Sequence, residues 1–119
     1  MAMILIVDDE EPLRDFLGMM LEDAGYEVRK AIHGAQALEI IAQDPPDLVI
    51  SDVMMPMVNG VELCRKLKAL NATHPIPVIL MSAAGRDLIE GAGADAFISK
   101  PFDLGNMESL VERWVPTTE

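Results

Sequence analysis

Five short aliphatic runs recur along the chain, and segments with helical or turn signals separate them. The clearest run is Met-Ile-Leu-Ile-Val at residues 3–7, where the apolar residues are continuous rather than alternating. A strand of this kind is buried on both faces, as in a parallel sheet that helices cover. The other runs lie at residues 26–31, 48–51, 78–81 and 96–99. This spacing predicts an α/β fold.

The segments between the runs indicate where helices cross over. Pro12 suits the first turn of a helix that Gly25 ends, further helices are expected over residues 35–43 and 61–70, and Asp103 is the candidate N-cap of a last one. Parallel neighbours need helical crossovers, so the sequence predicts an open parallel sheet with helices on both faces. The inward residues expected on the first and third helices are Leu13, Phe16, Leu17, Met20, Leu21, Leu63, Cys64, Leu67 and Leu70.

Length and charge limit the classes of function. At 119 residues the chain fits one domain, expected to span residues 1–119. The net charge of −11 argues against direct nucleic-acid binding, which needs cationic contacts to phosphate. The apolar runs are too short to span a membrane and no signal peptide is apparent, so a cytoplasmic protein is expected.

Polar side chains stand at the end of four of the expected strands. Asp8 and Asp9 follow the first strand, Asp52 the third, Ser82 the fourth and Lys100 the fifth. The carboxyl ends of parallel strands meet at one edge of the sheet, where ligands bind at the point at which strand order reverses. We therefore expect these side chains to form one site.

The chemistry of this set points to phosphoryl transfer. Carboxylates that meet within a few ångströms repel one another unless a cation is present, and an oxygen-only donor set favours Mg²⁺. Ser82 offers a hydroxyl donor and Lys100 a positive charge, both suited to phosphate oxygens. Asp52 can then act as the nucleophile.

Other polar residues have simpler explanations. Glu10 and Glu11 are interpreted as helix-start residues that face the positive end of the first helix. His33 and His74 are interpreted as loop or surface residues. The expected site therefore rests on the residues that follow the strands.

The motifs "ILIVDDE", "PDLVISDVMMPMVNG", "PVILMSA" and "GADAFISKPF" together resemble the receiver domain of the response-regulator family in two-component signalling. The resemblance covers nearly the whole chain. It implies a flavodoxin-like fold of five strand–helix units with the strand order 2-1-3-4-5. It also implies a signalling domain rather than an enzyme, phosphorylated by a sensor histidine kinase or a histidine phosphotransfer protein.

The resemblance also implies a role for each site residue. Asp52 is expected to be the phosphoacceptor and to contact Mg²⁺. Asp9 is expected to bind the ion directly, Asp8 to bind it largely through water, and the backbone carbonyl of Met54 to complete the protein ligands.

The same resemblance implies a switch. Ser82 and Lys100 are expected to bind the phosphoryl oxygens, and Phe97 occupies the aromatic switch position. The Lys100–Pro101 bond is expected to be cis. The surface that changes would comprise the fourth helix, the fifth strand and the last helix.

Two departures from the family pattern carry expectations. Between Ser82 and Lys100 the chain is shorter than most family members by about one helical turn, roughly 3.6 residues, so a shortened fourth helix is expected. Met54 and Ala84 flank the path of the hydrolytic water in the family and cannot orient it by hydrogen bonds. Slow self-dephosphorylation is therefore expected.

Two alternatives stay open from the residues. One is a phosphohydrolase of the haloacid dehalogenase type, although its nucleophile follows the first strand and here the acid pair comes first. The other is an interaction module that works without phosphorylation. The cognate kinase, the stimulus, the output partner, the oligomeric state and any further domain are not readable from the sequence.

Overall fold

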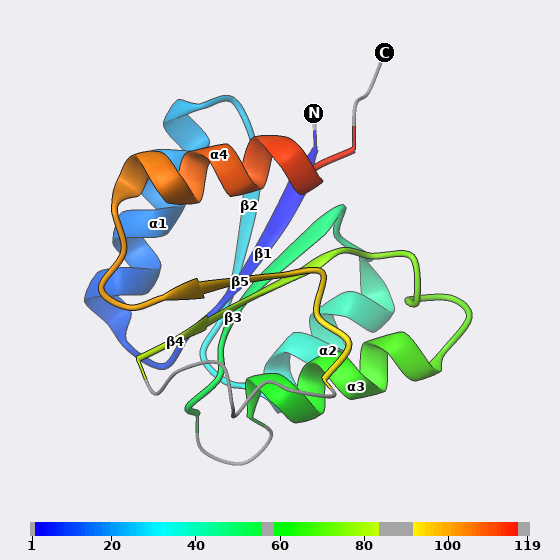
Figure 1. The fold of residues 1–119 in the computed structure, drawn as a ribbon. Helices are drawn as coiled ribbons and strands as arrows, with labels where there is room; N and C mark the ends of the chain where they lie inside the picture. The colour runs from blue at the N-terminus through cyan, green and yellow to red at the C-terminus, as the bar shows by residue number, and fades with distance from the viewer. Residues whose placement is uncertain (1, 56–58, 84–91, 117–119) are drawn as a thin grey trace.

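The computed structural model describes residues 2–55, 59–83 and 92–116. The strands form one parallel five-stranded sheet in the order β2-β1-β3-β4-β5 (Figure 1). Their bounds are β1 (Met3–Val7), β2 (Glu27–Ala31), β3 (Leu48–Asp52), β4 (Val78–Ser82) and β5 (Ala96–Ser99). The flavodoxin-like α/β fold and the strand order expected from the sequence are both confirmed.

Helices cover both faces of the sheet. In the described part of the chain they are α1 (Glu11–Asp23), α2 (Gly34–Gln43), α3 (Gly60–Ala69) and α4 (Leu104–Trp114). Helices α1 and α4 lie on one face, and α2 and α3 lie on the other (Figure 1). The shortened helix expected between strands β4 and β5 falls on residues 84–91, which lie outside the described residues.

The central strand β1 shows why the chain folds into three layers. All five of its residues are buried. Ile4 and Ile6 pack into the apolar cluster under α1 and α4, whereas Leu5 and Val7 pack into the cluster under α2 and α3. Successive side chains of a strand point to opposite faces, so a continuous apolar run supplies both clusters.

Two apolar residues expected to point inward are instead exposed. Phe16 on α1 is 49% exposed, and Leu70, which ends α3 as its C-cap, is 58% exposed. Helical spacing identified the apolar stripe but not its edges, because the width that neighbouring elements cover depends on the tertiary packing. Phe16 therefore belongs to the molecular surface near the carboxyl edge of the sheet.

Side chains fix where the helices begin. Asp103 caps α4, as predicted. His33, interpreted from the sequence as a loop or surface residue, caps α2 because its Nδ1 accepts a hydrogen bond from the backbone N–H of Gln36 at 3.0 Å. Asn59 caps α3 in the same way, so that helix begins shortly after the end of β3.

Candidate functional site

The strand register brings the polar residues to one edge of the sheet. Asp52 of β3 lies opposite Met81 of β4, and Ser82 lies opposite Ser99 of β5. Asp52 and Ser82 are the last residues of their strands, while Asp8 and Lys100 directly follow β1 and β5. The structure therefore gathers the side chains that the sequence placed at this edge.

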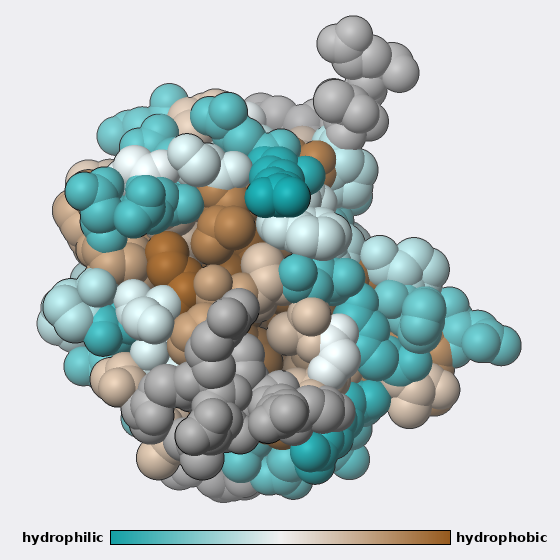
Figure 2. Space-filling view, in the orientation of Figure 1, coloured by the Kyte–Doolittle hydropathy of each residue, from teal (hydrophilic) through white to brown (hydrophobic). Residues whose placement is uncertain are grey.

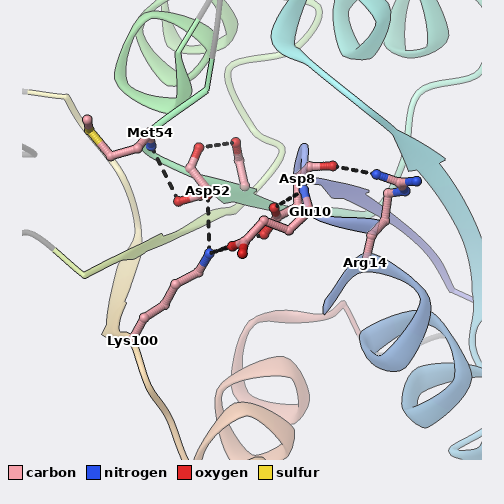
Figure 3. Close-up of polar contacts among 7 residues, drawn as sticks. Asp8, Glu10, Arg14, Asp52, Met54 and Lys100 are labelled. Atoms are coloured by element: carbon pink, nitrogen blue, oxygen red, sulfur yellow. Dashed lines mark hydrogen bonds and ion pairs between the residues drawn. The ribbon is translucent and has the colours of Figure 1, made fainter. Parts of the chain in front are cut away.

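Asp52 is an enclosed carboxylate that still opens to the surface. It is only 5% exposed, and it lines a surface depression of about 310 Å³. Its Oδ1 accepts a hydrogen bond from the backbone N–H of Met54 at 3.3 Å, and its Oδ2 lies 3.2 Å from Nζ of Lys100 (Figure 3). Both contacts fix the direction in which the carboxylate points.

Lys100 joins three carboxylates. Besides Asp52, its Nζ lies 3.3 Å from Oδ2 of Asp8 and 3.3 Å from Oε1 of Glu10. Its backbone N–H donates to the carbonyl of Ser82 at 2.9 Å, which places the lysine directly after β5. The Lys100–Pro101 bond is cis, as expected.

Burial and charge act against each other at this site. Asp8 is fully buried, and this burial raises the pKa of its carboxyl group even though Lys100 and the backbone N–H of Glu10 act to lower it. Burial also disfavours the charged form of Lys100, but the carboxylates of Asp8 and Asp52 outweigh this effect and raise the pKa of the lysine. The lysine is therefore held in its charged form.

Glu10 belongs to the site, which corrects its interpretation as a helix-start residue only. It is the N-cap of α1, but its side chain makes no capping hydrogen bond. Its carboxylate instead lies in a group with Asp8 and Asp52 whose oxygens are all within 4.8 Å of one another. The backbone turn from Asp8 to Glu10 directs this side chain toward Lys100, which the sequence spacing did not reveal.

This donor set is compatible with a hard divalent cation. Three carboxylate oxygens lie close enough together to contact one ion. Oxygen donors of this kind are the ligands that Mg²⁺ prefers, and a cation would relieve their mutual repulsion. Asp9, which the sequence predicted as a direct ligand, is exposed and lines the same depression as Asp52, but its carboxylate is not one of the three that meet.

The two remaining predicted residues lie on neighbouring strands. Ser82 is fully buried at the end of β4. Phe97 is the second residue of β5, is partly buried and packs against the apolar cluster under α2 and α3. Ser82 thus lies at the site edge, whereas Phe97 lies farther down an edge strand of the sheet.

An apolar groove of about 390 Å³ adjoins the acidic depression. Its apolar side chains include Leu13 and Phe16 of α1, Phe102 of the connection between β5 and α4, and Leu104 at the start of α4. Ala83 and Lys100 line both hollows. In Figure 2, apolar surface is gathered between α4 and β5, on the side of the molecule where residues 100–104 connect them.

An α/β domain with this topology and with an acidic pocket closed by a lysine defines a narrow class of proteins. The sequence model of the response regulator receiver domain family matches residues 4–112 of this chain. The chain therefore belongs to the receiver domain family of two-component signalling. In the described part of the chain, no helix combines the length and apolarity needed to cross a bilayer.

Individual relatives agree with this assignment. The chain is 37% identical over 123 residues to the DNA-binding dual master transcriptional regulator RpaA of Synechocystis, covering 100% of this chain and 51% of that protein. It is 45% identical over 103 residues to the phosphate regulon regulatory protein PhoB of Pseudomonas aeruginosa, covering 83% and 45% respectively. The chain thus spans about half the length of these relatives.

Solved structures show the same fold. A receiver domain of a signal transduction histidine kinase from Syntrophus aciditrophicus has a TM-score of 0.92 at 36% identity, covering 96% of this chain and 89% of that one. The chemotaxis protein CheY4 of Vibrio cholerae has a TM-score of 0.89 at 28% identity, covering 97% and 99%.

Proposed function

We propose that this domain, spanning residues 1–119, is the phosphoacceptor of a two-component phosphorelay, and that Asp52 receives the phosphoryl group. One observation carries the proposal: the enclosed Asp52 carboxylate faces an open depression while Nζ of Lys100 lies 3.2 Å from its Oδ2. A carboxylate so placed is accessible to a phosphodonor and has a fixed positive charge beside it.

The donor is a phosphohistidine of a sensor kinase or of a phosphotransfer protein. An oxygen of Asp52 attacks phosphorus, the bond between phosphorus and the imidazole nitrogen breaks, and the electron pair stays on that nitrogen. The product is an acyl phosphate on Asp52. The domain is modified once per event, so it acts as a signalling domain rather than as an enzyme that turns over a substrate.

Lys100 and Ser82 have distinct tasks in this scheme. The ammonium group of Lys100, already held between Asp8 and Asp52, pairs with a phosphoryl oxygen once Asp52 is modified. Ser82 ends the neighbouring strand, and its hydroxyl group donates to another phosphoryl oxygen.

Mg²⁺ fits the donor set, and the residues that would hold it are Asp8, Asp9, Asp52 and the backbone carbonyl of Met54. When bound, the ion would offset the negative charge of the phosphoryl oxygens. Glu10 adds a fourth carboxylate at the mouth of this site. The ammonium group of Lys100 attracts the approaching phosphoryl oxygens and so helps to place phosphorus in line with the oxygen of Asp52.

The output of phosphorylation is a changed surface. The new phosphoryl group adds up to about two negative charges and several acceptors beside Lys100 and Ser82. Ser82 moves toward it, and Phe97, which is only partly buried, fills the space that the hydroxyl group leaves. The surface of β5, α4 and the segment between β4 and β5 then selects a different partner.

The apolar groove supports docking of a helical phosphodonor. Leu13 and Phe16 form one side of it and Phe102 and Leu104 another, and Lys100 lies at its boundary with the acidic depression. An amphipathic helix that buries its apolar face in such a groove would bring a phosphohistidine to Asp52.

The relatives also bear on the output. RpaA is named as a DNA-binding regulator. This chain carries a net charge of −11, so we propose that any DNA binding is performed by another domain or partner rather than by the receiver itself. A cytoplasmic location and an absence of membrane contact complete the proposal.

Labelling with a small phosphodonor tests this function. Purified protein is incubated with acetyl phosphate with and without Mg²⁺, and bound phosphoryl is measured by intact mass. Wild type and Asp23→Asn, which changes an exposed aspartate at the end of α1, should both be labelled in a Mg²⁺-dependent manner. Asp52→Asn should not. Equal labelling of Asp52→Asn, or no labelling of wild type, contradicts the proposal and favours a module that works without phosphorylation.

A further inference from the structure

Arg14 makes a contact with the acidic loop that its sequence position did not suggest. It lies in the first turn of α1, and one guanidinium N–H donates to the backbone carbonyl of Asp8 at 2.9 Å. Figure 3 shows the side chain reaching the loop from the opposite side of Asp8 to Lys100. The two cations therefore contact different parts of the same residue.

This contact controls more than Asp8. The carbonyl of Asp8 and the backbone N–H of Asp9 belong to one planar peptide unit, so a bond that fixes the carbonyl oxygen also fixes the position from which the Asp9 side chain starts. The Asp8 side chain is held independently, because its Oδ1 accepts from the backbone N–H of Glu10 at 2.8 Å. Asp9 itself is exposed, and the hydrogen bond from Arg14 to the Asp8 carbonyl orients the peptide that precedes it.

We propose that Arg14 is a positioning residue for the cation site: through the Asp8 carbonyl it fixes the peptide from which Asp9 reaches the ion. The inference rests on the proposed function, since it takes the acid pair to be the Mg²⁺ ligands. It adds a residue whose side chain touches neither the phosphoryl group nor Asp52.

The positive charge of Arg14 makes the direction of the change in Mg²⁺ affinity informative. A cation near a metal site repels the metal, so removal of a guanidinium that acted only through its charge would tighten Mg²⁺ binding. Removal of a guanidinium that positions a ligand weakens binding instead, as loss of outer-shell contacts does at metal sites. The direction of the change therefore separates the two roles.

The experiment measures the Kd for Mg²⁺ by calorimetry on the unphosphorylated protein, with the melting temperature of the metal-free form recorded beside it. Arg14→Met removes the donor and keeps an apolar stem. Arg29→Met is the matched control, because it removes the same charge from an exposed arginine of β2 that pairs with Glu27 and Asp44. Arg14→Lys restores a charged donor.

We expect Arg14→Met to raise the Kd about tenfold, the lower end of the loss that removal of outer-shell contacts causes, with Arg29→Met at or slightly below the wild-type value. Arg14→Lys keeps a charged donor for the Asp8 carbonyl and should recover part of the lost affinity. An unchanged or lower Kd in Arg14→Met, or failure of Arg14→Lys to restore affinity, overturns the inference. If Arg14→Met does not fold, Arg14→Gln replaces it in the same comparison.

The outcomes for Arg14 and for Asp52 are separable. Wild type that binds Mg²⁺ but takes no label at Asp52 removes the proposed function and leaves the positioning role intact. If wild type is labelled and Arg14→Met keeps the wild-type Kd for Mg²⁺, only the positioning role is refuted. Wild type that does not bind Mg²⁺ contradicts both.

Discussion

Gly60, the first residue of α3, is expected to be intolerant of even one added carbon. A Cβ placed there would lie 2.9 Å from the carbonyl carbon of Asp52 and 2.9 Å from Cα of Val53, and it would overlap the carbonyl oxygen of Asp52. The backbone N–H of Gly60 also donates to the carbonyl of Val53 at 3.0 Å. The start of the helix therefore packs directly on the backbone of the acceptor residue.

Gly60→Ala must displace either α3 or the end of β3, because the obstructing atoms are backbone atoms. Overpacking costs about 1–3 kcal/mol, and at about 4 °C per kcal/mol for a domain of this size the melting temperature should fall by roughly 4–12 °C. A displacement of Asp52 by even part of an ångström should also slow labelling by acetyl phosphate about 10- to 100-fold.

Gly18→Ala is the matched control on α1. A Cβ there would meet Cε of Lys30 at 2.7 Å, but this is the end of a flexible side chain that is 40% exposed and can move away. The substitution gains up to about 1 kcal/mol of helix propensity, so this variant should melt at or above the wild-type temperature and be labelled normally. Wild-type melting and labelling in Gly60→Ala, or equal losses in both variants, would refute the steric explanation.

Burial holds the pKa of Asp8 above 3.8, so the folded protein loses stability as pH rises from that value through the folded pKa. In denaturant titrations of the metal-free protein, Asp8→Asn should therefore raise the free energy of unfolding at pH 7 by about 1 kcal/mol, and this gain should vanish near pH ~3. Burial raises the pKa of Cys64 to about 11. At pH ~8 a thiol reagent, whose reaction is monitored by absorbance, should therefore react at least ~100-fold more slowly with the native protein than with the unfolded chain. Phe16→Ser should slow phosphotransfer from a histidine phosphotransfer protein about tenfold while leaving acetyl phosphate labelling unchanged. Met19→Ser, at an exposed α1 residue outside the groove, should change neither rate, and equal slowing with both donors in Phe16→Ser would contradict donor docking in the groove.

The fold could be predicted from the sequence because its signals are local. The run at residues 3–7 is buried on both faces, and strand–helix alternation restricts such a chain to a parallel sheet. Strand order is different: it depends on which strands pair across the chain, and the expectation came from the family resemblance. The exposure of Phe16 and Leu70 was mispredicted because neither residue's spacing reveals how far neighbouring elements reach.

The site was predictable where one rule of topology decides it. Asp8, Asp52, Ser82 and Lys100 all stand at the ends of strands, so a parallel sheet must bring them to one edge. Their prediction needed no knowledge of side-chain conformation. The contacts of Lys100 with Asp8 and Asp52 agree with that expectation.

Glu10 and Arg14 were not predictable in the same way. Both lie at the start of α1, where the helix dipole explains an acidic residue but gives a basic residue no partner. Their actual partners are set by the turn from Asp8 to Glu10, whose geometry depends on how α1 packs against the sheet. Only the three-dimensional structure shows that the Glu10 carboxylate turns toward Lys100 and that the Arg14 guanidinium turns back to the loop after β1.

The most direct test of Asp52 as phosphoacceptor is chemical location of the acyl phosphate. After labelling with acetyl phosphate and Mg²⁺, borohydride reduction converts an aspartyl phosphate to homoserine, which peptide mass spectrometry places in the sequence. We predict homoserine at position 52 in wild type and in Asp23→Asn, and none in Asp52→Asn. Homoserine at Asp8 or Asp9 instead, or its absence from a folded wild-type protein that binds Mg²⁺, would contradict phosphorylation of Asp52.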